Sequence, residues 1–97
     1  MFRHVALFRF RPGVSAARRH AFHIAVRGLR DLVPQVSSLA AGPTLNLQPG
    51  GFDYVLMVDV ADAEAFWAYK EHPAHQRLIE EHIRPCVEET VRAQLTV

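Results

Sequence analysis

The chain has one cysteine, one lysine and no long apolar run. A lone cysteine, Cys86, excludes an internal disulfide and any cysteine-rich metal site. No stretch approaches the 18 consecutive apolar residues that cross a bilayer, which argues against a membrane partner. The first residues, 1–5, also lack the apolar core of a signal peptide. We therefore expect a soluble, cytoplasmic protein.

Acidic residues are scarce in the first half of the chain. Residues 1–50 carry seven arginines and one acid, Asp31, whereas residues 51–97 carry nine acids and four basic residues. A basic half can indicate a polyanion partner. However, 97 residues form only one domain (1–97), so the halves must share a core. We expect them to neutralise each other, within or between subunits.

The hydrophobic periodicity changes several times between period 2, typical of strands, and period 3.6, typical of helices. Ser15 and Asp62 are suitable helix N-caps, and Pro73 suits a first helical position. The predicted elements are a strand (2–11), a helix (15–33), a weak edge strand (36–46), a strand (52–60), two helices separated by a break (62–71 and 73–87) and a strand (89–97). This β-α-β-β-α-β order predicts an α+β, ferredoxin-like fold with one antiparallel sheet and helices on one face.

The other face of this sheet is predicted to be apolar and uncovered. The strand alternation assigns to it Val5, Leu7, Val55, Met57, Val91, Ala93 and Leu95. Such a patch is too large to remain in water. The alternation therefore predicts a homodimer that packs sheet against sheet.

Groups that donate, accept and move protons near pH 7 are concentrated at residues 69–75, at the break between the two helices. His72 precedes Pro73, which disfavours helical geometry, so we expect it to shape the turn or cap a helix. His75 falls in the first turn of the next helix and on its buried face. The helix dipole there favours a neutral ring that can accept a proton. Tyr69 ends the preceding helix on the same side.

Two further polar side chains, His4 and Tyr54, fall on the sheet face directed toward the helices. With Tyr69 and His75 they predict an apolar pocket with a few hydrogen-bonding groups. The competing interpretation is that these residues are ordinary core side chains whose polar ends are hydrogen-bonded.

Metal and nucleic-acid sites are the weaker alternatives. His72 and His75 have helical i, i+3 spacing, but no third ligand lies nearby, so we predict no metal. The stretch 51–55 partly matches the aromatic strand of RNA-recognition domains. The acid Asp53 beside its aromatic residues would repel phosphate, and the companion motif is missing. We predict no nucleic-acid partner.

Three segments together resemble the stress-responsive dimeric α/β-barrel family: 4–13 in the first strand, 54–58 in the third, and the His-Pro-x-His element within 69–75. The resemblance covers essentially the whole chain and implies two ferredoxin-like subunits packed into a barrel. The family includes olivetolic acid cyclase, which closes a polyketide by aldol condensation without metal or organic cofactor. The resemblance implies catalytic roles for His75 and Tyr69 and no cofactor. It also matches His4 to a pocket residue. We predict that the substrate-binding residues are His4, Tyr54, Phe8, Phe22, Val26 and His72.

The chain departs from that cyclase at two informative positions. Tyr54 stands where the cyclase has a pocket histidine, and the carboxylate that orients its catalytic histidine is missing, with Gln94 the nearest substitute. Two functions follow as hypotheses. The first is a cofactor-free, polyketide-cyclase-like enzyme acting on a small apolar carbonyl compound. The alternative is a non-catalytic ligand-binding or stress-protective homodimeric module.

Overall fold

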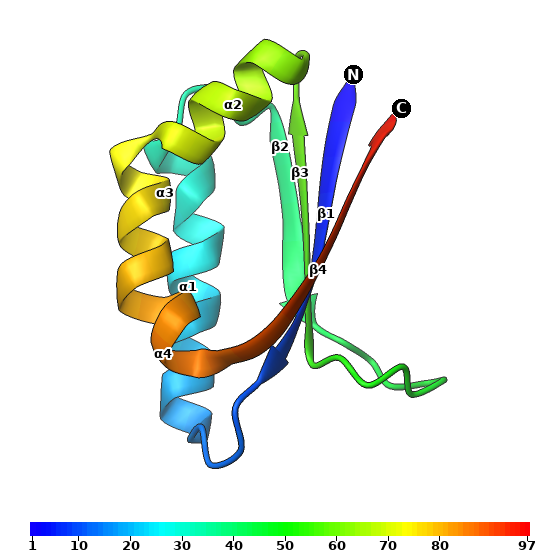
Figure 1. Ribbon diagram of the computed structural model, residues 1–97, viewed down its shortest axis with the longest axis vertical. Coiled ribbons are helices and arrows are strands. Elements are labelled where there is room, and N and C mark those ends of the chain that lie inside the picture. Colours follow the sequence, from blue (N-terminus) through cyan, green and yellow to red (C-terminus); the bar gives the residue numbers. More distant parts are fainter.

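The computed structural model covers residues 1–97 and contains one four-stranded antiparallel sheet. The strand order is β2-β3-β1-β4, and the two chain ends meet beside each other on β1 and β4 (Figure 1). The strands are β1 (Phe2–Phe10), β2 (Ser38–Pro43), β3 (Tyr54–Val60) and β4 (Val87–Thr96). The predicted antiparallel ferredoxin-like sheet is confirmed.

All the helices cover one face of this sheet (Figure 1). They are α1 (Ala16–Leu32), α2 (Ala63–Glu71), α3 (Pro73–Leu78), a π-helical turn (Ile79–Ile83) and α4 (Arg84–Cys86). None of them is long and apolar enough to cross a bilayer.

The predicted caps form as expected. Ser15 Oγ accepts a hydrogen bond from the Arg18 amide at 3.1 Å, and Asp62 Oδ1 accepts from the Ala65 amide at 2.8 Å. His72 caps α3, because its Nδ1 accepts from the Ala74 amide at 3.0 Å. Pro73 occupies the first turn of α3, where its missing N–H costs no hydrogen bond because first-turn amides have no acceptor within the helix. The helix break at 72–73 is therefore locally encoded.

The segment from α3 to α4 winds continuously from Pro73 to Cys86, and Pro85 explains its irregular end. Pro85 has no N–H, so it cannot donate to the Glu81 carbonyl one turn earlier. Arg18 of α1 donates to this carbonyl instead, at 3.3 Å. The π-helical turn lies immediately before this site and places Ile79 and Ile83 toward the sheet side, where both line a cavity described below.

The predicted alternation sets which face of each strand is buried. In β1 and β3 every second residue beginning with His4 and Tyr54 is buried against the helices. β2 is an edge strand, as predicted, but it is shorter than expected because pairing with β3 ends at Pro43, opposite Tyr54. Cys86 is buried in the core with its thiol free.

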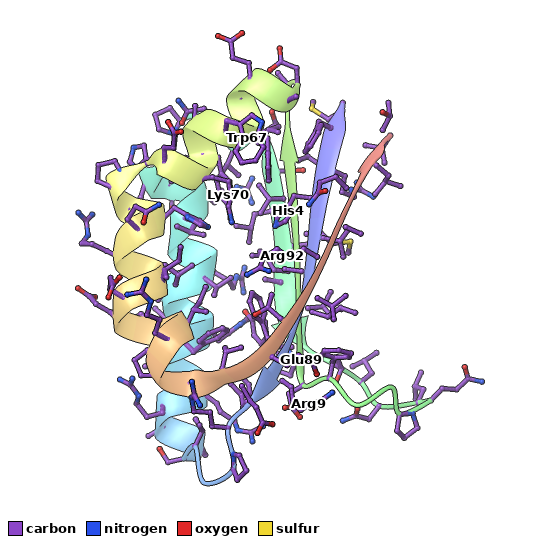
Figure 2. The ribbon with its side chains drawn as sticks, in the orientation of Figure 1. His4, Arg9, Trp67, Lys70, Glu89 and Arg92 are labelled. Atoms are coloured by element: carbon purple, nitrogen blue, oxygen red, sulfur yellow. The ribbon has the colours of Figure 1, made fainter.

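The open face has an apolar centre and charged ends. Strand pairing aligns two rows of small and apolar residues across all four strands: Ala40, Met57, Val5 and Ala93 in one, and Gly42, Val55, Leu7 and Val91 in the other. The bidentate Arg3–Asp59 pair lies beyond one row. The Arg9–Glu89 pair, at 2.6 Å, lies beyond the other (Figure 2). Both pairs join the basic half of the chain to the acidic half.

Candidate active site

A cavity of about 90 Å³ lies between the helices and the β1–β4 side of the sheet. It has room for several water molecules, since one needs about 10–15 Å³ of such space. The lining residues come from every helix and strand except α1, β2 and α4. They are His4, Ala6 and Phe8 of β1, Leu56 of β3, Tyr69 and Lys70 of α2, His75 and Leu78 of α3, Ile79 and Ile83 of the π-helical turn, and Thr90 and Arg92 of β4.

His75 lies in the first turn of α3 and is only 5% exposed. Its Nδ1 is 3.1 Å from the backbone carbonyl of Lys70. A carbonyl can only accept, so Nδ1 carries the proton and Nε2 keeps a free lone pair. The only side-chain hydrogen bond of His75 is this one through Nδ1, so Nε2 has no partner within the chain. Burial lowers the pKa of His75 to about 4, and the positive charge of Lys70 adds to this effect. The ring is therefore a neutral proton acceptor at pH 7.

His4 is the complementary imidazole. The Gln94 side-chain amide donates to Nδ1 of His4 at 3.0 Å, so the ring proton is on Nε2. The ring also packs against Phe66 of α2, with centroids 5.0 Å apart. Burial lowers the pKa of His4 to about 4, with Lys70 and Arg92 contributing. Gln94 therefore orients His4. The resemblance suggested Gln94 instead as the substitute for the carboxylate that orients the catalytic histidine, His75.

Tyr69 contacts His75 directly, with ring centroids 4.7 Å apart. Its hydroxyl is buried and has no hydrogen-bond partner within the chain. Burial also raises the pKa of this hydroxyl well above its usual value, so Tyr69 remains a neutral donor. An unpaired buried hydroxyl costs about 1–3 kcal/mol, unless a ligand or water satisfies it. Tyr69 lines the cavity, so a ligand or water there could supply the missing partner.

Two cations, Lys70 and Arg92, also line this cavity, and the sequence motifs do not single them out. Lys70 is half-buried and Arg92 is exposed, so they mark the solvent side of the cavity. Figure 2 shows them on opposite walls, Lys70 on α2 and Arg92 on β4. Burial and the charge of Arg92 lower the pKa of Lys70. The alternation of β4 contains the missed signal, because Thr90, Arg92 and Gln94 share the helix-side face.

Tyr54 does not join the other three polar side chains. Its hydroxyl shares a 2.6 Å hydrogen bond with Nδ1 of His23 on α1, and its ring packs edge-to-face on Phe22. Burial raises the pKa of Tyr54 to about 12. The expected convergence of four polar-tipped residues is therefore wrong for Tyr54, because α1 supplies a nearer partner. Since Tyr54 is 1% exposed, it also cannot stack on a nucleic-acid base.

Three other predicted binding residues lie away from the cavity lining. Phe22 and Val26 are fully buried on the inner face of α1. His72 uses its Nδ1 as the α3 cap. Phe8 does line the cavity. No group of three or more histidines, cysteines or acids has the arrangement of a metal site.

The profile of the stress-responsive A/B barrel domain family matches residues 2–97. The chain belongs to this family. The matched residues include every strand and helix described above. No protein of curated function matches the sequence.

Solved structures agree with the family assignment. A dimeric ferredoxin-like protein of unknown function from Thermobifida fusca is 28% identical, with a TM-score of 0.89 over 99% of this chain and 90% of that one. An Arabidopsis thaliana protein is 18% identical, with a TM-score of 0.89 over 100% and 95%. A hydroxynitrile lyase from Passiflora edulis is 16% identical, with a TM-score of 0.87 over 99% and 92%. The fold is thus found in a dimer and in an enzyme.

Proposed function

We propose that the protein is a cofactor-free acid–base catalyst that removes a proton from the carbon beside a carbonyl group. The observation that carries this proposal is that one cavity is lined by a free imidazole lone pair, a buried hydroxyl without a partner and a second imidazole that can donate. Nε2 of His75 is the acceptor, and the Tyr69 hydroxyl and His4 Nε2–H are the donors. All three groups belong to residues that line the same space.

The chemical step follows from these protonation states. The C–H bond next to the ligand carbonyl breaks, and the proton moves to Nε2 of His75. The electron pair moves onto the carbonyl oxygen and forms an enolate. Tyr69 and His4 donate hydrogen bonds to that oxygen and stabilise its charge. The enolate carbon then either regains a proton or attacks a second carbonyl carbon of the ligand. In the second case the new alkoxide takes the proton from His75, completing a polyketide-cyclase-like aldol reaction.

No carboxylate accepts a hydrogen bond from Nδ1 of His75. A backbone carbonyl at the helix break accepts it instead. The carbonyl of Lys70 lies in the last turn of α2, where helical carbonyls lack intrahelical partners. It accepts from both His75 Nδ1 and the Gln76 side-chain amide, the latter at 2.7 Å. A carbonyl fixes the tautomer but stabilises an imidazolium less than a carboxylate would. We therefore expect a slow reaction.

Hydrogen–deuterium exchange at the activated carbon tests the proposal. Methyl acetoacetate in D₂O, followed by NMR and corrected for uncatalysed exchange, should lose its C2 protons faster with the wild type. His75→Ala should reduce the catalysed rate by about 10²–10⁴-fold, which is typical for a general base. His20→Ala, at an exposed histidine of α1, is the matched control and should not change the rate. Equal rates for wild type and His75→Ala would favour the alternative, a non-catalytic binding or stress-protective module.

We also propose that the protein is a homodimer formed through the open sheet face. The two rows across the sheet are apolar, and ion pairs at both ends can set the register between copies. The relative from T. fusca is described as dimeric. The cytoplasmic location expected from the sequence remains a prediction.

A charge at the centre of the open face tests the dimer. Met57→Asp should give a monomer or an aggregate in analytical ultracentrifugation, since an unpaired buried charge costs several kcal/mol. Leu32→Asp makes a similar change on the exposed side of α1 and should leave the dimer intact. Wild-type protein that sediments as a stable monomer at micromolar concentration would contradict the dimer.

A further inference from the structure

The mouth of the cavity carries two positive charges and no negative one. Lys70 and Arg92 line it, and no aspartate or glutamate is among the lining residues. The ion pairs of the chain involve Arg3, Arg9 and Arg84 instead. Two neighbouring cations without a counter-ion repel each other. An anion held between them would remove this repulsion.

We propose that the cavity takes a carbonyl compound bearing a carboxylate, with Lys70 and Arg92 binding the carboxylate while His75 faces the carbon beside the ketone. This inference rests on the proposed function and specifies its substrate class. The ketone end occupies the small inner cavity beside Tyr69 and His4, because those residues offer donors to an oxygen. The charged end lies toward solvent, where the two cations are placed on α2 and β4 (Figure 2).

The same arrangement couples ligand charge to the strength of the base. The cationic residues that line the cavity together with His75 are Lys70 from α2 and Arg92 from β4, and the neutral titratable ones are His4 and Tyr69. Lys70 disfavours the imidazolium form of His75. A bound carboxylate offsets this positive charge and makes His75 a stronger base. A neutral ligand of the same shape cannot do this.

Acetoacetate and methyl acetoacetate test the proposal, because they share the ketone and differ mainly in the charge of the carboxyl end. Dissociation constants from NMR titration at low salt should favour acetoacetate in the wild type. Lys70→Met and Arg92→Met should each weaken acetoacetate binding roughly tenfold, as expected for loss of one charge-assisted contact, and should barely affect the ester. Arg77→Met, on the exposed side of α3, is the control and should change neither. Acetoacetate should also raise the pKa of His75 in ring NMR spectra, and the ester should not.

Equal affinity for the acid and the ester, or a preference for the acid that survives in both Lys70→Met and Arg92→Met, would overturn the carboxylate site. This result is separate from the exchange experiment. If His75→Ala still catalyses exchange but acetoacetate is preferred through Lys70 and Arg92, the anion site stands and the catalytic proposal fails. If His75→Ala loses exchange and the acid is not preferred, the catalytic proposal stands and the anion site fails.

Discussion

Tyr54 and Tyr69 occupy the same layer between helices and sheet, and each is 1% exposed, yet their hydroxyls have opposite environments. The hydroxyl of Tyr54 is paired with His23, within a cluster of aromatic rings. The hydroxyl of Tyr69 has no partner in the chain and belongs to a residue that lines a cavity. The comparison separates a part of the core that is built for stability from a part that leaves its polar groups free for a ligand.

The largest expected effect concerns the two histidines that line the cavity with Tyr69, His4 and His75. It is the pH dependence of unfolding. Between about pH 4 and 6.5 the unfolded chain protonates His4 and His75, whereas the folded chain keeps them neutral. The free energy of unfolding should therefore fall as the pH is lowered through this window. The loss should be at most about 3 kcal/mol for each histidine, since one pKa unit is worth about 1.4 kcal/mol and solvent screening reduces the effect. Urea titrations at several pH values measure it.

His4→Gln and His75→Gln should each flatten this pH dependence, because a glutamine does not titrate. His20→Gln, at an exposed position, should leave it unchanged. A wild type whose stability is constant between pH 4 and 6.5 would show that the two imidazoles are not held neutral by burial.

A smaller effect distinguishes the two tyrosines directly. Tyr54→Phe removes the partner of His23 and should lower the free energy of unfolding by about 1–3 kcal/mol. Tyr69→Phe removes a hydroxyl without a partner, so it should leave the stability unchanged or raise it slightly. Chemical denaturation of the two variants measures this difference. The comparison fails if Tyr69→Phe is the more destabilising of the two.

The sequence predicts the sheet well because strand alternation is a local property. Residues two apart in β1 and β3 alternate between the helix side and the open face, as the hydrophobic pattern indicates. Helix starts are also encoded locally. The side chains of Ser15, Asp62 and His72 accept hydrogen bonds from backbone amides only two or three residues later in the chain. These features need no knowledge of distant packing.

The candidate site is predicted less completely because its partners are distant or lie in the backbone. His23 is 31 residues from Tyr54, and their hydrogen bond depends on how α1 crosses the sheet. The partner of His75 is a backbone carbonyl, which side-chain motifs do not reveal. The sequence gives little sign of Lys70 and Arg92, because charged residues are rarely found in a buried layer. Only the alternation of β4 places Arg92 on the helix side.

The exchange assay on the two tyrosine variants is the most direct test of the central claim, that the free polar groups at the cavity serve a ligand. With methyl acetoacetate in D₂O, Tyr69→Phe should slow catalysed exchange roughly 10²-fold while the protein stays folded, as expected for loss of one donor to the enolate. Tyr54→Phe should keep the wild-type rate despite its lower stability. The reverse outcome, exchange lost in Tyr54→Phe and preserved in Tyr69→Phe, would contradict the account.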